Sequence, residues 1–350
     1  MSEKLPAKSN NQLYMELVDT LPKFTHEFFF FGISEKAILT KLSYARDIKY
    51  FFEFAIDHIP SFSHMKLHEI SVDDLKDLSP MDINKFLAWM DDQELSEKTR
   101  ARRKTSVSVL FTYLINTERK LQFNPVSGAQ KIEIEQSDYV IYLKLSEQKQ
   151  LLDCIQYGTG LSKHQLYYHE KYKKRDLAIV FLFLDTGLRV SELHSLNMKD
   201  VIMFEDPIEP ENNECYVITL RKGHKKSLAA SKVYFSDEAR DYIKDYLSSR
   251  EIAGEKFNDA TPLFTTLEGD RLSVREIQQM LKKYVKAALG RSDISVHKLR
   301  SSFAMEFYKA EHNILVLQQR MGHKSIAATN IYARASDKEE AVKQSRNWRH

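Results

Sequence analysis

The sequence predicts a mainly α-helical protein with two domains: an all-helical first domain and a mostly helical second domain with a small antiparallel β-sheet. The chain has 350 residues, more than one compact core of the usual size requires. Apolar residues recur at spacings of three and four along much of it, as amphipathic helices require. β-Branched and aromatic residues concentrate in three short stretches, which predict strands at 200–205, 215–220 and 231–235.

Residues 1–126 are predicted to form the helical first domain. An apolar stripe between Ser34 and His58 predicts its first core helix. A second helix is expected after Ser79, because Pro80 fits the first turn of a helix. A third helix is expected to start near Ser96 and to bury the apolar run that ends at Leu114.

Residues 127–145 lack helical periodicity and are predicted to be an interdomain linker. Residues 146–350 form the predicted second domain and its C-terminal tail, with Ser146 as the expected cap of its first helix. The tyrosine-rich stretch 157–174 is polar and is predicted to be a loop or an insertion. A buried helix is expected to follow it and to end at Gly187.

Net charge is only +3, so any affinity for a polyanion has to come from local clusters of charge. Two clusters contain no acidic residue within their own sequence, and phosphate groups are the commonest partners of such clusters. A solvated helix face or loop is an equally good explanation for either cluster alone. The cations are Lys98, Arg100, Arg102, Arg103 and Lys104 at the start of the third helix, and Arg221, Lys222, Lys225 and Lys226 between the last two strands.

Several polar residues stand where helices are expected to begin or end. Arg189 follows the stop at Gly187, and Glu192 lies three residues later, within reach of its guanidinium. His297 and Arg300 are three residues apart and therefore share one face of a helix. Each of these, taken alone, is more often a surface pair or a packed residue.

A histidine and a tyrosine follow in the last part of the chain. Gly322 is expected to stop a helix, which places His323 in a turn. Ser325 is expected to cap a short helix that carries Tyr332. The chain has 17 tyrosines, so Tyr332 alone would be taken as a packing residue.

Taken together and in order, the motifs GLR with Glu192, RKG, HKLR, GH and a tyrosine nine residues after that histidine resemble the tyrosine recombinase/integrase family. The resemblance covers nearly the whole chain and is strongest to Xer-type enzymes that act as a single recombinase. It implies a DNA-binding core-binding domain followed by the catalytic fold of that family. Ser301 and Met321 depart from the usual residues at their positions without touching the chemistry.

The resemblance also implies a role for each matching residue. Tyr332 would be the nucleophile, Arg189 and Arg300 the phosphate clamp, and Lys222 the general acid. His297 and His323 would support the reaction, and Glu192 would orient Arg189. Two guanidiniums suit this chemistry because each presents paired donors to the nonbridging oxygens without losing its proton. Nearby cations would favour the phenolate of a tyrosine whose ordinary pKa is about 10.

The implied partner is double-stranded DNA with a specific recombination site, bound by a homo-tetramer that joins two sites through a Holliday junction. No cofactor and no metal ion are expected. The reaction would resolve chromosome dimers or integrate and excise a mobile element. Two alternatives remain at this point: a type IB topoisomerase-like DNA relaxase, and an accessory DNA-binding protein without catalytic activity.

Composition restricts the location of the protein. No apolar run is long enough to span a bilayer, and the polar N-terminus lacks the features of a secretory signal. The two cysteines, Cys154 and Cys215, are too few for a disulfide framework or a cysteine metal cluster. A cytoplasmic protein without membrane contact is therefore expected.

Overall fold

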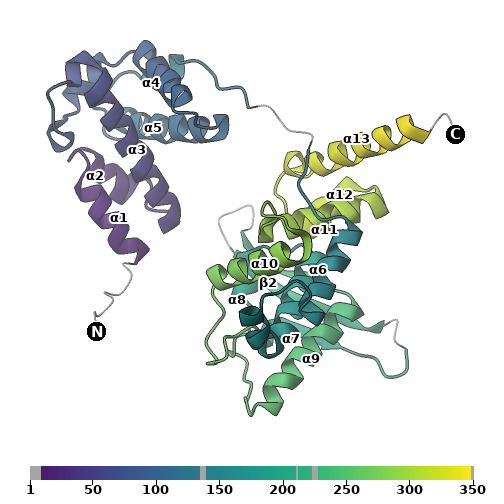
Figure 1. Cartoon of the computed structure of the whole chain (residues 1–350). Helices are drawn as coiled ribbons and strands as arrows, with labels where there is room; N and C mark the ends of the chain where they lie inside the picture. Colours follow the sequence, from purple (N-terminus) through teal and green to yellow (C-terminus); the bar gives the residue numbers. More distant parts are fainter. Residues whose placement is uncertain (1–8, 135–138, 210–211, 223–227, 348–350) are drawn as a thin grey trace. The chain divides into compact units, whose positions relative to one another are not determined.

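The structure, a computed structural model, describes residues 9–134, 139–209, 212–222 and 228–347. The chain forms two compact units, Met1–Gln136 and Ser137–His350 (Figure 1). Both are mostly helical, and the second also holds a three-stranded sheet, which confirms the predicted fold class. The roles predicted for the two domains and for the linker at 127–145 stay predictions. Among the described residues, no helix is long and apolar enough to cross a membrane.

The first unit packs its helices around one hydrophobic core. Its α-helices are α1 (Asn10–Asp19), α2 (Thr25–Glu27), α3 (Ile38–His58), α4 (Pro80–Asp92) and α5 (Glu97–Asn116). Short π- or 3-10-helical turns occupy Phe28–Gly32, Pro60–Phe62, Leu67–Glu69, Asp73–Asp77 and Pro125–Gly128. The three helices predicted for this unit are confirmed as α3, α4 and α5.

Capping residues fix where two of these helices begin. Ser79 precedes α4, where its hydroxyl accepts a hydrogen bond from the Asp82 N–H and the Asp82 carboxylate accepts one from the Ser79 N–H. Ser96 caps α5 with one such bond, since its hydroxyl accepts a hydrogen bond from the Thr99 N–H. Each side chain satisfies a peptide group that has no partner inside its helix.

The second unit is built around α7, which packs on α6, α9 and α11 (Figure 1). Its α-helices are α6 (Leu145–Tyr157), α7 (Lys163–Thr186), α8 (Val190–Ser195), α9 (Asp237–Ile252), α10 (Val274–Leu289), α11 (Val296–Glu311), α12 (Ile314–Met321) and α13 (Asn330–Asn347). Short 3-10 turns occupy Met198–Asp200 and Ile326–Ala328.

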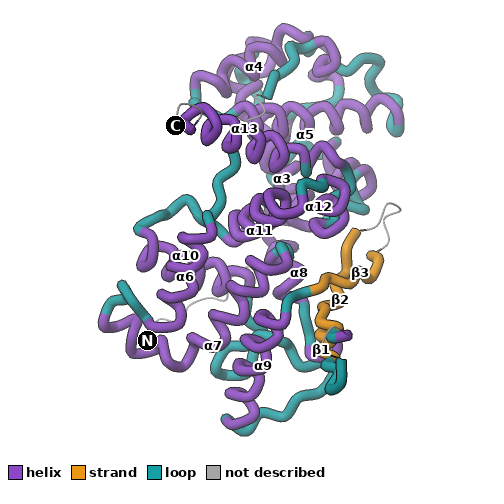
Figure 2. The backbone as a smooth tube through the Cα atoms, turned by 90° about the vertical axis from the view of Figure 1, so that its right-hand side faces the viewer, coloured by secondary structure: helices purple, strands orange, loops and turns teal. Residues whose placement is uncertain are grey.

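The sheet has the order β1-β2-β3 with both pairs antiparallel, and Figure 2 shows its strands together at one side of the second unit. The strands are β1 (Val201–Phe204), β2 (Glu214–Lys222) and β3 (Leu228–Tyr234), which confirms the three predicted stretches. In the register, Lys222 lies opposite Leu228. Arg221 and Lys222, predicted to lie in the connection, therefore still belong to β2.

Two predictions at the start of this unit are wrong. The polar stretch 157–174 is not a loop, because α7 begins at Lys163, where the Ser162 hydroxyl caps it. His169 lies in this part of α7 and is buried. Its Nε2 lies 2.7 Å from the carbonyl oxygen of Ile155. Ser146 is not the cap of α6: that helix begins at Leu145, so Ser146 lies inside its first turn.

Candidate active site

Arg189 is held where the chain turns from α7 into α8. Gly187 ends α7 in the left-handed conformation, with φ of 62°, and buried Leu188 follows it. Arg189 is then extended, and the first turn of α8 brings Glu192 back toward it. Glu192 accepts hydrogen bonds from the Arg189 peptide N–H, at 2.9 Å, and from its Nη1, at 2.6 Å. The predicted contact between these two residues is present, and it fixes the direction of the guanidinium.

Arg300 lies deep in the second unit, with 2% of its surface exposed. It sits in the first turns of α11, next to the buried Leu299. Its Nη1 donates to the carbonyl oxygen of Gly187, and its Nη2 donates to that of Met321. A buried charge requires such partners. Arg300 therefore ties the end of α7 to the end of α12.

The two guanidiniums converge on one turn of the chain. Arg189 Nη2 lies 3.4 Å from the carbonyl oxygen of Gly322, the residue after the one whose carbonyl Arg300 holds. Gly322 ends α12 with φ of 60°, as the sequence predicted. Arg189, directly before α8, and Arg300, in α11, thus donate to the carbonyl groups of two consecutive residues. A single anionic group entering there could accept hydrogen bonds from both.

His297 lies three residues before Arg300, and its side chain is exposed. Desolvation is the largest cause that lowers the pKa of His297, and the charges of Arg300 and Arg189 add to it. Both clamp arginines therefore act on this imidazole. Because its pKa lies below 6.5, His297 is mostly neutral at pH 7 and can accept a proton.

His323 lies in the turn directly after the Met321–Gly322 peptide. Its peptide N–H donates to the carbonyl of Gln318 at 3.1 Å. Its Nδ1 lies 2.9 Å from Oγ1 of Thr329, a fully buried residue. This bond orients the ring. Thr329 was not singled out from the sequence, because a threonine in a short connection carries no signal of such a role.

Tyr332 is buried, with 6% of its surface exposed. It packs in a cluster of apolar side chains that includes Phe303, Met305 and Met321. The short helix expected for it is wrong: Ser325 caps only the 3-10 turn Ile326–Ala328, and Tyr332 stands in the first turn of the 18-residue α13. The tyrosine therefore packs in the same cluster as Met321, whose carbonyl group Arg300 holds, and its side chain is shielded from solvent.

For the predicted basic cluster between β2 and β3, the structure gives only the position of the backbone, and only for its first two residues. Arg221 and Lys222 are the last residues of β2. Gly223, Lys225 and Lys226 lie outside the described residues. The predicted general acid at Lys222 and the predicted DNA contacts of this cluster stay predictions.

The basic cluster at the start of α5 has partners within the first unit. Arg102 and Arg103 pair with the buried Asp47 of α3, Arg103 at 3.8 Å, and Ser106 donates to the same carboxylate at 2.7 Å. Arg103 also lies 3.5 Å above the centre of the Tyr50 ring. A cluster that is free of acids in the sequence therefore receives acids from other segments in the fold.

The remaining cations of this cluster differ in their surroundings. Arg100 pairs with Asp91 at 2.8 Å, and Lys104 donates to the carbonyl of Ala129 at 3.2 Å. Lys98 is exposed at the start of α5. Contact with DNA stays a prediction for all five, but every one of them except Lys98 is given a partner within the first unit.

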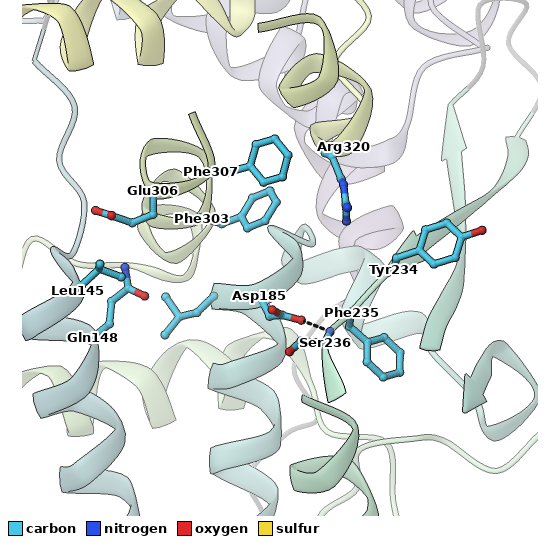
Figure 3. Close-up of a pocket in the computed structure, with 11 residues that line it drawn as sticks. Leu145, Gln148, Asp185, Tyr234, Phe235, Ser236, Phe303, Glu306, Phe307 and Arg320 are labelled. Atoms are coloured by element: carbon cyan, nitrogen blue, oxygen red, sulfur yellow. Dashed lines mark hydrogen bonds between the residues drawn. The ribbon is translucent and has the colours of Figure 1, made fainter. Parts of the chain in front are cut away.

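A cavity of about 450 Å³ lies between the end of α7, the end of β3, α11 and α12 (Figure 3). The Ser236 N–H donates to Asp185 at 2.7 Å across it, and burial raises the pKa of that carboxyl group. Phe303 and Arg320 also line this cavity. Asp185 and Arg320 come shortly before Gly187 and Met321, the two residues whose carbonyl groups Arg300 holds.

Solved structures with this fold are tyrosine recombinases. The chain superposes on the XerH site-specific recombinase bound to palindromic difH substrate, in a post-cleavage complex, with a TM-score of 0.67; 97% of this chain and 95% of that chain are covered at 19% identity. It superposes on the Tn1549 transposon integrase in complex with circular intermediate DNA with a TM-score of 0.60, covering 93% and 95% at 22% identity.

Sequence relatives agree with the fold. The chain is 28% identical over 338 residues to the tyrosine recombinase XerC of Caldanaerobacter subterraneus subsp. tengcongensis, covering 93% of this chain and 87% of that protein. It is 25% identical over 356 residues to the tyrosine recombinase XerS of Streptococcus agalactiae serotype III, covering 93% and 95%. Residues 142–339 match the phage integrase family. The chain therefore belongs to this family of tyrosine recombinases, which are DNA breaking-rejoining enzymes.

Proposed function

We propose that this protein is a site-specific recombinase in which Tyr332 attacks a DNA phosphodiester and forms a 3′-phosphotyrosine. The observation that carries the proposal is the convergence of Arg189 and Arg300 on the carbonyl oxygens of the consecutive residues Gly322 and Met321. Attack by the tyrosine gathers negative charge on the nonbridging phosphate oxygens. Guanidiniums fixed in place before the reaction stabilise that charge without reorganising.

The other matching residues handle protons and orientation. His297, with its lowered pKa, accepts the proton of the Tyr332 hydroxyl as the P–O bond forms. The departing 5′-oxygen takes a proton from Lys222. Glu192 keeps the Arg189 guanidinium directed toward the phosphate, and His323, oriented by Thr329, donates to a phosphate oxygen.

The covalent intermediate conserves the energy of the cleaved ester, so a 5′-hydroxyl from a second strand can reverse the reaction and reseal the DNA. Exchange between two duplexes requires two cleaved sites, a homo-tetramer and a Holliday junction. The full-length similarity to XerC and XerS enzymes supports this assembly. Resolution of chromosome dimers and integration of a mobile element use the same chemistry, and mapping the DNA bound in cells distinguishes the two roles.

The test uses a nicked duplex that contains the mapped site, since the nick releases the short fragment and traps the intermediate. Wild-type protein should form a covalent complex that survives detergent, and Tyr332→Phe should form none. Tyr308→Phe is the matched control, because Tyr308 packs against the same cluster and should leave trapping unchanged. Equal trapping by Tyr332→Phe contradicts the proposal.

Recombination and relaxation differ in their products. Two plasmids that carry the site should yield joined or exchanged molecules, whereas a topoisomerase-like relaxase would relax plasmids that lack any site. Binding without a covalent complex would instead identify an accessory protein.

A further inference from the structure

Three side chains from distant parts of the second unit meet beside α13. The Tyr142 hydroxyl donates to both carboxylate oxygens of Glu339, at 2.9 and 2.8 Å. Lys309 Nζ donates to the Tyr142 oxygen at 2.7 Å and lies 3.0 Å from Glu339 Oε2. Tyr142 belongs to the segment that enters the unit, Lys309 to α11 and Glu339 to α13. These three residues are called the latch below.

The charge states required for the latch follow from its surroundings. Burial would raise the pKa of Glu339, but hydrogen bonds from Lys309 and Tyr142 hold that pKa below its usual value. Burial raises the pKa of Tyr142, so its hydroxyl keeps its proton and can donate. Each bond in the chain from ammonium to hydroxyl to carboxylate strengthens the other.

The latch acts on the helix that carries Tyr332. Glu339 lies seven residues, about two helical turns, after Tyr332, so both lie on one face of α13. Ala335 and Ser336 lie between them on that face, and both are buried. Tyr142 and Tyr332 belong to the same apolar cluster. Because the helix is rigid, the position of Glu339 determines the position of Tyr332.

The rest of the second half of α13 is poorly packed. Residues 341–346 are exposed. A groove of about 870 Å³ separates this part of the helix from the entering segment, and Lys144, Val342 and Lys343 are among its lining residues. With little apolar surface buried there, polar contacts at Glu339 contribute much of what holds α13 in place.

The entering segment itself is firmly anchored. The Leu143 N–H donates to the hydroxyl of Ser302 on α11 at 2.8 Å, and Leu143 is fully buried. Tyr142 therefore presents its hydroxyl from a fixed position. Opening the latch moves α13 rather than the segment.

We propose that the latch is a built-in autoinhibitory contact that holds α13 in the conformation where the Tyr332 side chain is buried. The inference rests on the proposed role of Tyr332 as the nucleophile. Cleavage then occurs from a minor conformation in which α13 has moved, and its rate is proportional to the population of that conformation. Weakening the latch raises this population and speeds cleavage, whereas general damage to the fold slows it.

The first test is the single-turnover rate of covalent complex formation on a saturating nicked site. Tyr142→Phe removes one hydroxyl and both of its bonds to Glu339, and we expect it to raise this rate about fivefold or more. Affinity for DNA should not change. Tyr246→Phe is the control, since it removes the hydroxyl of another buried tyrosine, one that bonds to Thr265, and should keep the wild-type rate.

A second variant tests the network. Glu339→Gln removes the ion pair with Lys309 and should also speed cleavage. The double variant should change the logarithm of the rate by less than the sum of the two single changes, because both substitutions open the same latch. A wild-type or slower rate in Tyr142→Phe overturns the proposal.

Hydrogen exchange separates this inference from the proposed chemistry. In protein without DNA, the amides of residues 333–346 should exchange faster in Tyr142→Phe than in wild type or Tyr246→Phe. If the wild-type protein forms no covalent complex, the role of Tyr332 fails while exchange still decides whether the latch holds α13. Equal exchange in all three proteins overturns the latch.

Discussion

Arg189 and Arg300 hydrogen-bond to the carbonyl oxygens of consecutive residues, Gly322 and Met321. The two arginines differ in their exposure to solvent and in their other partners. The Arg189 side chain is 40% exposed and leans on Glu192, whereas Arg300 is enclosed and braces two helix ends. Both can contribute to binding a phosphate, but only Arg300 is also part of the core.

This difference predicts different effects of the same substitution. Lysine keeps the charge but loses the paired donors, so Arg189→Lys and Arg300→Lys should each slow covalent complex formation by about a hundredfold or more. Arg300→Lys should in addition lower the free energy of unfolding by about 2 kcal/mol, because two buried carbonyl groups lose their partners. Urea unfolding should show nearly wild-type stability for Arg189→Lys. Equal losses of stability would contradict the structural role of Arg300.

The lowered pKa of His297 predicts how cleavage depends on pH. The neutral imidazole accepts a proton, so the rate should fall on acidification with a midpoint below 6.5. Stability should fall in the same direction: the unfolded chain, with its ordinary histidine pKa, binds this proton first as the pH drops. The measurement is the single-turnover rate between about pH 5 and 8. His297→Gln should be slow throughout and should lose this inflection.

Gly187 supports the clamp through its backbone. A Cβ atom at this position would lie 2.4 Å from Cδ1 of Phe303, and the φ of 62° is unfavourable for any other residue. Gly187→Ala should therefore cost about 3 kcal/mol of stability and slow cleavage, because the carbonyl that Arg300 holds has to shift. Gly290→Ala is the matched control.

Gly290 has a φ of 64°, with no atom within 4 Å of an added Cβ. Only the backbone term of about 1 kcal/mol applies there. Thermal unfolding of the two variants measures the difference, and equal melting temperatures would show that Phe303 can move aside.

The basic start of α5 predicts two kinds of cation. Lys98→Ala should weaken DNA binding at all sequences and reduce the slope of log K against log salt by about one, with stability unchanged. Arg103→Ala should lower stability by about 2 kcal/mol, since it removes the cation over Tyr50 and a partner of the buried Asp47. Filter binding across salt concentrations and urea unfolding distinguish them. A change in stability for Lys98→Ala would argue against its assignment as a DNA contact.

The fold class and the three strands could be predicted from the sequence because they depend on local patterns. The apolar stripe of α3 and the cap at Ser79 are complete within their own segments. The first half of α7 could not be predicted in this way, because its residues are polar on nearly every face. The burial of His169 against Ile155 depends on another helix. A pattern search has no apolar stripe to find there.

The candidate site divides in the same way. Arg189, Glu192 and Gly322 could be found because motif order and helix ends locate them. Their shared contacts could not, because backbone carbonyls carry no residue type: nothing in the letters indicates that Met321 accepts a bond from Arg300. The burial of Tyr332 is equally invisible, since it arises from side chains of α11 and α12.

The two roles of Arg300, in phosphate binding and in the packing of the core, matter for the choice of an inactive variant of this protein. Replacing this guanidinium would silence the enzyme and also loosen the end of α7 and the turn at Met321. Loss of binding by such a variant would then be misattributed to lost phosphate recognition. Tyr332→Phe removes a single oxygen atom and leaves these contacts intact. It is therefore the better inactive variant for capturing the chromosomal sites that the protein binds.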